Sequence, residues 1–238
     1  MAQAQYADVI EDAERAMKIG VLGAGLMSEA LSVRWTSLGH EVLIAGRTAT
    51  KAIKLAEKLG ANASAGAFAE AVGFGDVVLL AVRYQGVLET LLAAGARDGA
   101  FVGKTIIDCN NPVEVDDFTL VTCGGMSMAE AIAGTAVGAS IVKAFHLCQA
   151  SVWKMAPPVF DRRLLSVPIC GNEQASKQVV SELIEEMGCR AVDLGPLHQA
   201  RNLEPMAAVI IKLLFSGADP TTNFNLVDSG TARSECVS

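Results

Sequence analysis

Hydrophobic positions along this chain occur in short, nearly continuous runs rather than in strict alternation with polar residues. Such runs are typical of strands that are buried on both faces of a parallel sheet. The predicted strands are KIGVL (18–22), EVLIA (41–45), a short segment near 61–64, DVVLLAV (76–82), KTIIDC (104–109) and SIVKAF (140–145). Between these strands the apolar residues recur at helical spacing, which predicts helices over 26–38, 49–59, 67–72, 85–94 and 128–133. This alternation predicts an α/β fold with a Rossmann-type, doubly wound parallel sheet.

The regular alternation of predicted strands and helices changes after residue 146. The remaining predicted strands are 166–170 and 190–195, and the remaining predicted helices are 173–187 and 199–215. We therefore expect an N-terminal extension over 1–16, a Rossmann domain over 17–150, and a small C-terminal α+β domain over 151–238.

The last predicted helix carries the segment MAAVIIKLLF (206–215), which is apolar on nearly all sides. All-round apolarity predicts burial, either beneath the sheet or against a second subunit. We favour the second alternative, which makes the protein a homodimer.

Composition and charge narrow the function classes. The chain has 238 residues, of which 51% are hydrophobic and 19% charged, and its net charge is −7. Without a dense cluster of Lys and Arg, a nucleic-acid partner is not expected. No apolar run reaches the length of a membrane span, and the first residues lack the order of a secretion signal, so a cytoplasmic location is expected. The six cysteines show no metal-ligand spacing, which indicates reduced thiols and no metal site.

A glycine-rich turn follows the first predicted strand and precedes the first predicted helix. Its first glycine permits a tight turn, and its second lets backbone N–H groups approach a pyrophosphate at the positive end of the helix. This context predicts a dinucleotide site, with an ordinary helix cap as the alternative. The expected contacts are Gly23, Ala24, Gly25, Leu26 and Met27. Ser28 stands at the third position of the motif, where Gly or Ala is usual, and is expected to loosen the packing.

The tip of the second strand distinguishes NADP from NAD. A chain that binds NAD presents an acidic residue here to the adenosine ribose, whereas this chain presents Gly46, Arg47 and Thr48, with Lys51 in the next turn. The guanidinium of Arg47 can bind a 2′-phosphate through charge-assisted hydrogen bonds. NADP(H) is therefore the predicted cofactor. The alternative is that Arg47 and Lys51 are solvated surface residues.

Three further segments follow predicted strands at the edge where open α/β sheets bind ligands. Two of these segments are expected near the ribose and the nicotinamide, and their residues are Ala81, Val82, Arg83, Asn110, Asn111 and Pro112. His146 follows the strand 140–145 and is a candidate catalytic residue, with a structural role as the alternative.

Several segments together resemble a known family. These are KIGVLGAGLMSEALSVRWTSLGHEVLIAGRT, DVVLLAV, IVKAFH, and VPICG followed by an acidic helix and the turn DLGPL. They are similar to the coenzyme F420-dependent NADP oxidoreductases, a family related to the cytosolic domain of membrane metalloreductases. The resemblance implies NADP(H) on the Rossmann domain and a deazaflavin in the cleft beside it. It also implies 2′-phosphate contacts at Gly46, Arg47 and Lys51, and a second-substrate pocket at His146, Leu147, Cys148 and Ala150.

Three functions are consistent with these features. The first is hydride transfer between NADP(H) and a second carrier, with coenzyme F420 as the leading candidate. The second is NADPH-dependent reduction of a small substrate at a C=N, C=C or C=O bond, which would need a proton donor such as His146 or Tyr84. The third is a non-catalytic protein that binds NADPH for regulation.

Overall fold

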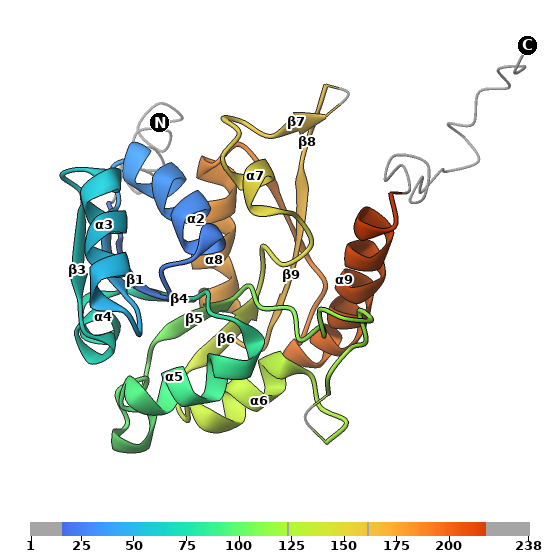
Figure 1. Ribbon diagram of the computed structural model, residues 1–238, viewed down its shortest axis with the longest axis horizontal. Coiled ribbons are helices and arrows are strands. Elements are labelled where there is room, and N and C mark those ends of the chain that lie inside the picture. The colour runs from blue at the N-terminus through green and yellow to red at the C-terminus, as the bar shows by residue number, and fades with distance from the viewer. Residues whose placement is uncertain (1–15, 123, 161, 218–238) are drawn as a thin grey trace, which may run out of the picture.

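The structure is a computed structural model that describes residues 16–122, 124–160 and 162–217, and it contains one large, mostly parallel sheet (Figure 1). The strand order is β10-β9-β6-β5-β4-β1-β2-β3. Their bounds are β1 (Lys18–Leu22), β2 (Glu41–Ala45), β3 (Ala63–Gly66), β4 (Val77–Leu80), β5 (Thr105–Asp108), β6 (Ser140–Lys143), β9 (Ser166–Gly171) and β10 (Arg190–Asp193). Every neighbouring pair is parallel except β6 and β9, which are antiparallel.

Helices cover both faces of the sheet, so the predicted doubly wound fold is confirmed. One apolar cluster joins the sheet to α2 (Leu26–Ser37), α3 (Ala49–Leu59) and α8 (Gln174–Glu186). A second cluster, on the other face, joins it to α4 (Phe68–Phe74), α5 (Val87–Ala93), α6 (Met128–Thr135) and the start of α9 (Ala200–Phe215). The helices begin and end within a few residues of the predicted bounds.

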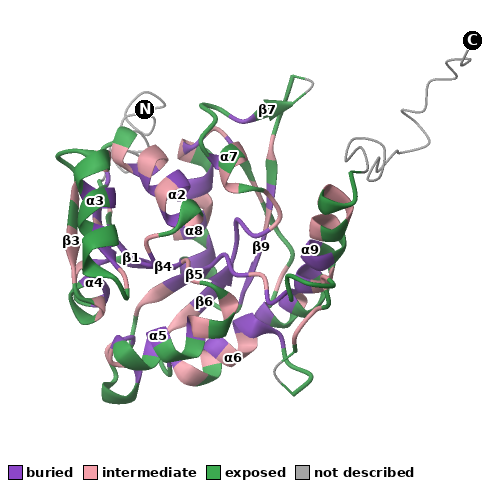
Figure 2. Ribbon diagram, viewed as in Figure 1, coloured by how far each residue is buried: buried purple, intermediate pink, exposed green. Residues whose placement is uncertain are grey.

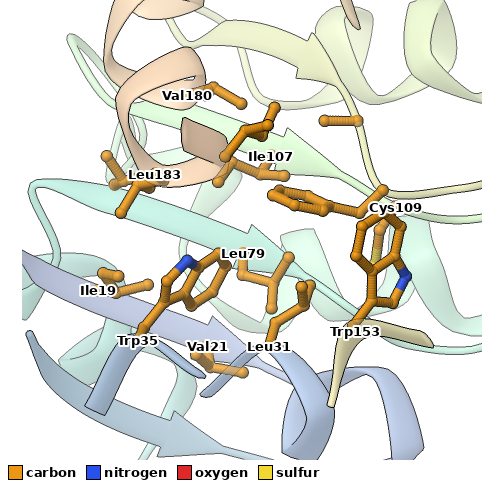
Figure 3. Close-up of a cluster of buried hydrophobic side chains, with 14 of the residues drawn as sticks. Ile19, Val21, Leu31, Trp35, Leu79, Ile107, Cys109, Trp153, Val180 and Leu183 are labelled. Atoms are coloured by element: carbon orange, nitrogen blue, oxygen red, sulfur yellow. The ribbon is translucent and has the colours of Figure 1, made fainter. Parts of the chain in front are cut away.

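Aromatic residues hold the first cluster together near the end of β6. Figure 3 shows Trp35 and Trp153 among the aliphatic side chains of β1, β4 and α8. The ring of Phe145 lies between the two indoles in edge-on contacts, with centroid distances of 6.0 Å to Trp35 and 5.1 Å to Trp153. Trp153 belongs to the short helix α7 (Ala150–Trp153), so this packing fixes the segment that follows β6.

The C-terminal part extends the same sheet. Val142 pairs with Gly171, and Lys143 with Cys170, so β9 adds directly to β6. The division into domains at 17–150 and 151–238 stays a prediction, and the extension 1–16 lies outside the described residues except for Ala16. The sequence pattern missed the hairpin of β7 (Val159–Phe160) and β8 (Arg163–Leu164), whose strands are too short to show a period.

The two halves of α9 differ in burial (Figure 2). Ala200, Leu203 and Ala207 are buried near its start, whereas Val209 is 52% exposed and Phe215 is 75% exposed. Phe215 stacks on Phe118 at 5.3 Å. Dimerisation through the exposed half stays a prediction. No described helix combines the length and apolarity that crossing a bilayer requires.

Candidate functional site

The carboxyl ends of the parallel strands bring most of the predicted site residues to one edge of the sheet. This placement follows from the topology, because β1, β2, β4, β5 and β6 all run in the same direction. The segments that follow these strands are 23–27, 46–48, 81–83, 110–112 and 146–150, in that order.

The glycine-rich turn has the shape that a pyrophosphate needs. Gly23 has φ +130°, and a Cβ there would lie 2.1 Å from the carbonyl oxygen of Ala81. A Cβ on Gly25, in contrast, would have no atom within 4 Å, so space is open at the N-terminus of α2. The expected loosening at Ser28 is wrong, since this side chain is fully buried and its Oγ donates to the Ala81 carbonyl at 3.4 Å. The turn therefore joins α2 to β4 and leaves its outer side free.

The residues after β2 form a solvent-exposed cationic corner. Arg47, Thr48 and Lys51 are all exposed, and neither cation has a hydrogen-bond or ion-pair partner among the described residues. A Cβ on Gly46 would come within 3.4 Å of the Ala24 Cβ, so the corner lies directly beside the nucleotide turn. These cations are available to an anionic ligand.

A cavity of about 590 Å³ adjoins the other side of the nucleotide turn. Four segments contribute to its walls: the start of α2, the end of β5, the segment after β6, and one side of α9. Those wall residues are Leu26, Met27, Cys109, Asn111, 145–151, Lys154, Ala207, Ile210, Ile211 and Leu214. Leu26 is 72% exposed although it is a large apolar residue. Its side chain offers an apolar surface where the nucleotide turn meets the cavity.

His146 lies in the wall of this cavity with both ring nitrogens buried and without a partner among the described residues. The preceding residue, Phe145, has φ +61°, a left-handed conformation that is rare for a bulky residue and is often found at functional sites. Burial, and then the charge of Lys143, holds the pKa of His146 well below 6.5. The imidazole is therefore neutral near pH 7 and is a poor proton donor.

The other titratable groups of the cavity wall are weak acids or already paired. The Asn111 amide nitrogen donates to the His146 carbonyl at 2.7 Å, while its Oδ1 is buried without a partner. Burial, together with the charge of Asp108, raises the pKa of Cys109 to about 12. Burial raises the pKa of Cys148 to about 11. The ammonium of Lys154 is bound to Glu29 at 2.5 Å.

Some predicted residues do not face the cavity. The side chain of Asn110 is turned into the sheet, where it donates to the Leu80 carbonyl at 2.9 Å and to Asp108 at 2.8 Å. Arg83 is exposed outside the cavity wall, and the Tyr84 hydroxyl donates to Glu114 at 2.5 Å. The segments 81–83 and 110–112 thus reach the predicted edge, but within them only Asn111 is part of the wall.

A buried charged cluster beside the cavity was missed by sequence reasoning. Lys143, Asp108 and Glu204 are between 0% and 2% exposed, and the Lys143 ammonium lies 2.9 Å from Asp108 and 3.0 Å from Glu204. Burial alone would lower the pKa of Lys143, but the two carboxylates outweigh it and raise that pKa. The signal in the sequence was a lone charge inside the apolar run SIVKAF.

Comparison with known proteins relates this site to a family. Residues 18–112 match the model of the family described as NADP oxidoreductase, coenzyme F420-dependent. This segment contains the nucleotide turn, the cationic corner and Asn111. The predicted resemblance is thereby confirmed over the matched segment, and with it an NADP-dependent oxidoreductase that uses NADP(H).

Individual relatives extend the similarity beyond this family segment. The F420-dependent NADP reductase of Methanothermobacter marburgensis is 29% identical over 219 residues, covering 83% of this chain and 92% of the archaeal protein. A solved structure from Arthrobacter sp. FB24, described as a candidate F420-dependent NADP reductase, is 29% identical with a TM-score of 0.75, covering 84% of this chain and 95% of that one.

A longer protein is also similar to this NADP oxidoreductase. Metalloreductase STEAP3 of Rattus norvegicus is 29% identical over 208 residues, which is 87% of this chain. The match spans only 39% of the rat protein. The similarity therefore concerns one part of that protein, and its activity as a whole is not transferred to this chain.

Proposed function

We propose that this chain transfers a hydride between NADP(H) and coenzyme F420, with the nicotinamide at the mouth of the 590 Å³ cavity and the deazaflavin inside it. The observation that carries the proposal is a largely apolar cavity beside the nucleotide turn, in which His146 is neutral and the Lys154 ammonium is already paired with Glu29. A cavity of this size can hold a flat ring system. Hydride transfer between two carriers needs orientation more than acid catalysis.

The predicted nucleotide contacts form the first half of the proposed site. Gly23, Ala24, Gly25 and Met27 would hold the pyrophosphate at the N-terminus of α2, and Arg47 with Lys51 would bind the 2′-phosphate. The space beside Gly25 fits such a group, as do the two cations, which have no partner within the described part of the chain. When bound, NADPH supplies the hydride, and the chain's own residues orient it and exclude water.

The second half is the cavity wall. Leu26 and the α9 residues Ile210, Ile211 and Leu214 would pack on the faces of the ring system. His146 and the Oδ1 of Asn111 offer unpaired hydrogen-bonding atoms to its polar edge. His146 acts here as a neutral binding residue rather than as an acid, because its pKa lies well below 6.5.

The same features bear on the two alternative functions. Reduction of a C=O or C=C bond of a small substrate would need a proton at the product oxygen or carbon, and neither neutral His146 nor Tyr84, which is bound to Glu114, supplies one readily. A purely regulatory NADPH-binding protein would not need a second cavity beside the nucleotide turn. The experiment below is expected to give a different result for each of these two alternatives.

Stopped-flow absorbance with purified protein, NADPH and F420 tests the proposal. We expect the deazaflavin band to bleach rapidly with NADPH and at least tenfold more slowly with NADH at the same concentration. Tight NADPH binding without bleaching would reject F420, and a panel of cyclic imines and enones would then be assayed by NADPH oxidation. Binding without oxidation by any acceptor would favour the regulatory alternative.

Assembly and location are proposed at a coarser level. The exposed apolar residues of α9, including Met206, Val209 and Phe215, support a homodimer. A cytoplasmic location stays a prediction. Sedimentation at micromolar concentration tests the dimer, and Val209→Asp should shift the protein toward monomer.

A further inference from the structure

Lys143 contacts two other segments of the chain, the end of β5 and the start of α9, from a fully buried position on β6. Its Nζ lies 2.9 Å from Asp108 Oδ2, 3.0 Å from Glu204 Oε1 and 2.6 Å from the carbonyl oxygen of Asn110. An ammonium group has three donors, and all three are used here. The side chain therefore has a single defined position.

The two carboxylates of the cluster are fully satisfied by groups on either side. Both oxygens of Glu204 accept backbone N–H groups at the start of α6, from Met128 at 2.8 Å and Ala129 at 3.1 Å. Asp108 Oδ1 accepts the backbone N–H and the side-chain amide of Asn110, at 2.9 and 2.8 Å. No carboxylate oxygen in the cluster lacks a donor.

Stability alone does not explain such a cluster. Desolvating each ion costs several kcal/mol, and well-packed apolar residues in the same positions often give equal or greater stability. What the ions add is geometry, since each pair fixes a distance between two segments. These segments are the end of β5, the end of β6 and the start of α9.

The members of the cluster lie next to three of the four wall segments of the cavity. The Asn110 carbonyl directly precedes Asn111, whose amide donates to the His146 carbonyl. Lys143 itself lies three residues before His146 on the same strand end. Glu204 lies one turn before Ala207 and two turns before Ile211, on the helix that forms the opposite wall. The cluster thus joins three of the four wall segments at one point.

The position of α9 depends on its first two turns. Arg201 binds Glu130 on α6 at 2.7 Å, outside the cavity, and Glu204 binds Lys143 beneath it. Leu214 lies ten residues beyond Glu204, which at about 1.5 Å per residue is roughly 15 Å along the helix. A small rotation at Glu204 therefore displaces the far end of the wall by a larger distance.

We propose that Lys143 is a positioning residue, which fixes α9 and the Asn111–His146 wall relative to each other and so sets the width of the second-substrate cavity. The inference rests on the proposed function only in assigning the second substrate to this cavity. It predicts that the cluster controls binding of that substrate much more than binding of NADPH, whose proposed pyrophosphate and 2′-phosphate contacts follow β1 and β2.

Two variants keep the test independent of folding failure. Lys143→Met alone leaves two carboxylates buried without their cation and is expected to fold poorly. Glu204→Gln keeps an acceptor for α6 while removing one charge, and Lys143→Met combined with Glu204→Gln removes an opposite pair of charges. Arg201→Gln is the matched control, because it removes the other α6–α9 contact at a residue that is 54% exposed and outside the cavity.

Steady-state kinetics and hydrogen exchange read out the effect. For Glu204→Gln and the double variant we expect the KM for F420 to rise at least tenfold and the NADPH Kd to stay within threefold of wild type. Amide exchange over residues 206–214 and at Asn111 and Val113 should accelerate in both variants. For Arg201→Gln we expect a lower melting temperature with the F420 KM within twofold of wild type.

The outcomes separate this inference from the proposed function. An unchanged F420 KM in the cluster variants, or an equal rise in Arg201→Gln at the same loss of melting temperature, would reduce Lys143 to a structural role. If the wild type does not reduce F420, the proposed function fails, and the exchange measurement still decides. Faster exchange in both segments then supports the positioning role, and unchanged exchange overturns it.

Discussion

The cationic corner after β2 and the cavity beside α9 lie on either side of the same glycine-rich turn, but they differ in solvent exposure. In the corner, Arg47 and Lys51 are exposed and unpaired among the described residues. In the cavity, the polar groups of His146 and Asn111 are buried. Binding at the corner depends on charge in water, which salt screens, whereas binding in the cavity depends on desolvation and shape. The two substrates should therefore respond differently to the same perturbation.

The largest expected effect comes from a methyl group on the turn that separates the two regions. Gly23→Ala would place Cβ 2.1 Å from the Ala81 carbonyl oxygen at φ +130°. We expect loss of several kcal/mol of stability, enough to prevent folding, because backbone on both sides must move. Thermal unfolding followed by circular dichroism measures this.

Gly25→Ala is the matched control for that substitution. Its Cβ would meet no atom within 4 Å, so the fold should be retained. The methyl would occupy the space assigned to the pyrophosphate, and the NADPH Kd should rise at least tenfold. A Gly25→Ala protein that binds NADPH normally would contradict the assignment of this turn.

Removing the Arg47 guanidinium should raise the KM for NADPH but not the KM for NADH. A charge-assisted contact contributes about 1.5 to 3 kcal/mol, so Arg47→Ala should raise the NADPH KM more than tenfold and leave NADH use unchanged. Lys54→Ala on the same helix is the matched loss of an exposed cation and should change neither KM by more than twofold. Equal effects of Arg47→Ala on both cofactors would contradict the assignment of the 2′-phosphate to this corner.

The smallest expected effect concerns the buried imidazole. The pKa of His146 is lowered in the folded protein, so below pH 6.5 the unfolded chain binds a proton that the folded chain does not. The free energy of unfolding should therefore fall with decreasing pH, by up to about 1.4 kcal/mol per unit below pH 6.5. Urea unfolding of wild type and His146→Gln between pH 7 and pH 5 measures the difference, and parallel pH dependences would contradict it.

The same depressed pKa makes a prediction for turnover. Wild-type kcat should show no ionisation near pH 6.5, because the imidazole stays neutral through this range. A bell-shaped profile with an acid limb near pH 6.5 would restore His146 as a general acid and favour reduction of a small substrate.

The difference between the two regions also explains what the sequence could reveal. The nucleotide turn and the cationic corner are contiguous stretches whose chemistry depends on local order, so residues 23–27 and 46–51 could be identified directly. The confirmed sheet follows from apolar runs in the same way. The cavity combines four distant segments, and its α9 wall appeared in the sequence only as an apolar helix with two alternative explanations.

Side-chain direction could not be predicted either. Asn110 and Asn111 are neighbours with equal propensities, yet one is turned into the sheet and the other toward the cavity. The cluster of Lys143, Asp108 and Glu204 required tertiary pairing across three segments. A lone lysine in an apolar strand is a usable signal, because a buried ammonium requires a partner.

The antiparallel pairing of β6 with β9 has a consequence for how substrates enter and leave. Hinge closure around a ligand uses a few loop or element-terminal residues that absorb large φ/ψ changes. Here the backbone ladder continues from the nucleotide-binding strands into β9 beside Lys143, so rigid-body opening of the two halves would break it. We therefore expect substrates to reach the cavity through a small displacement of the far end of α9 rather than through a domain movement.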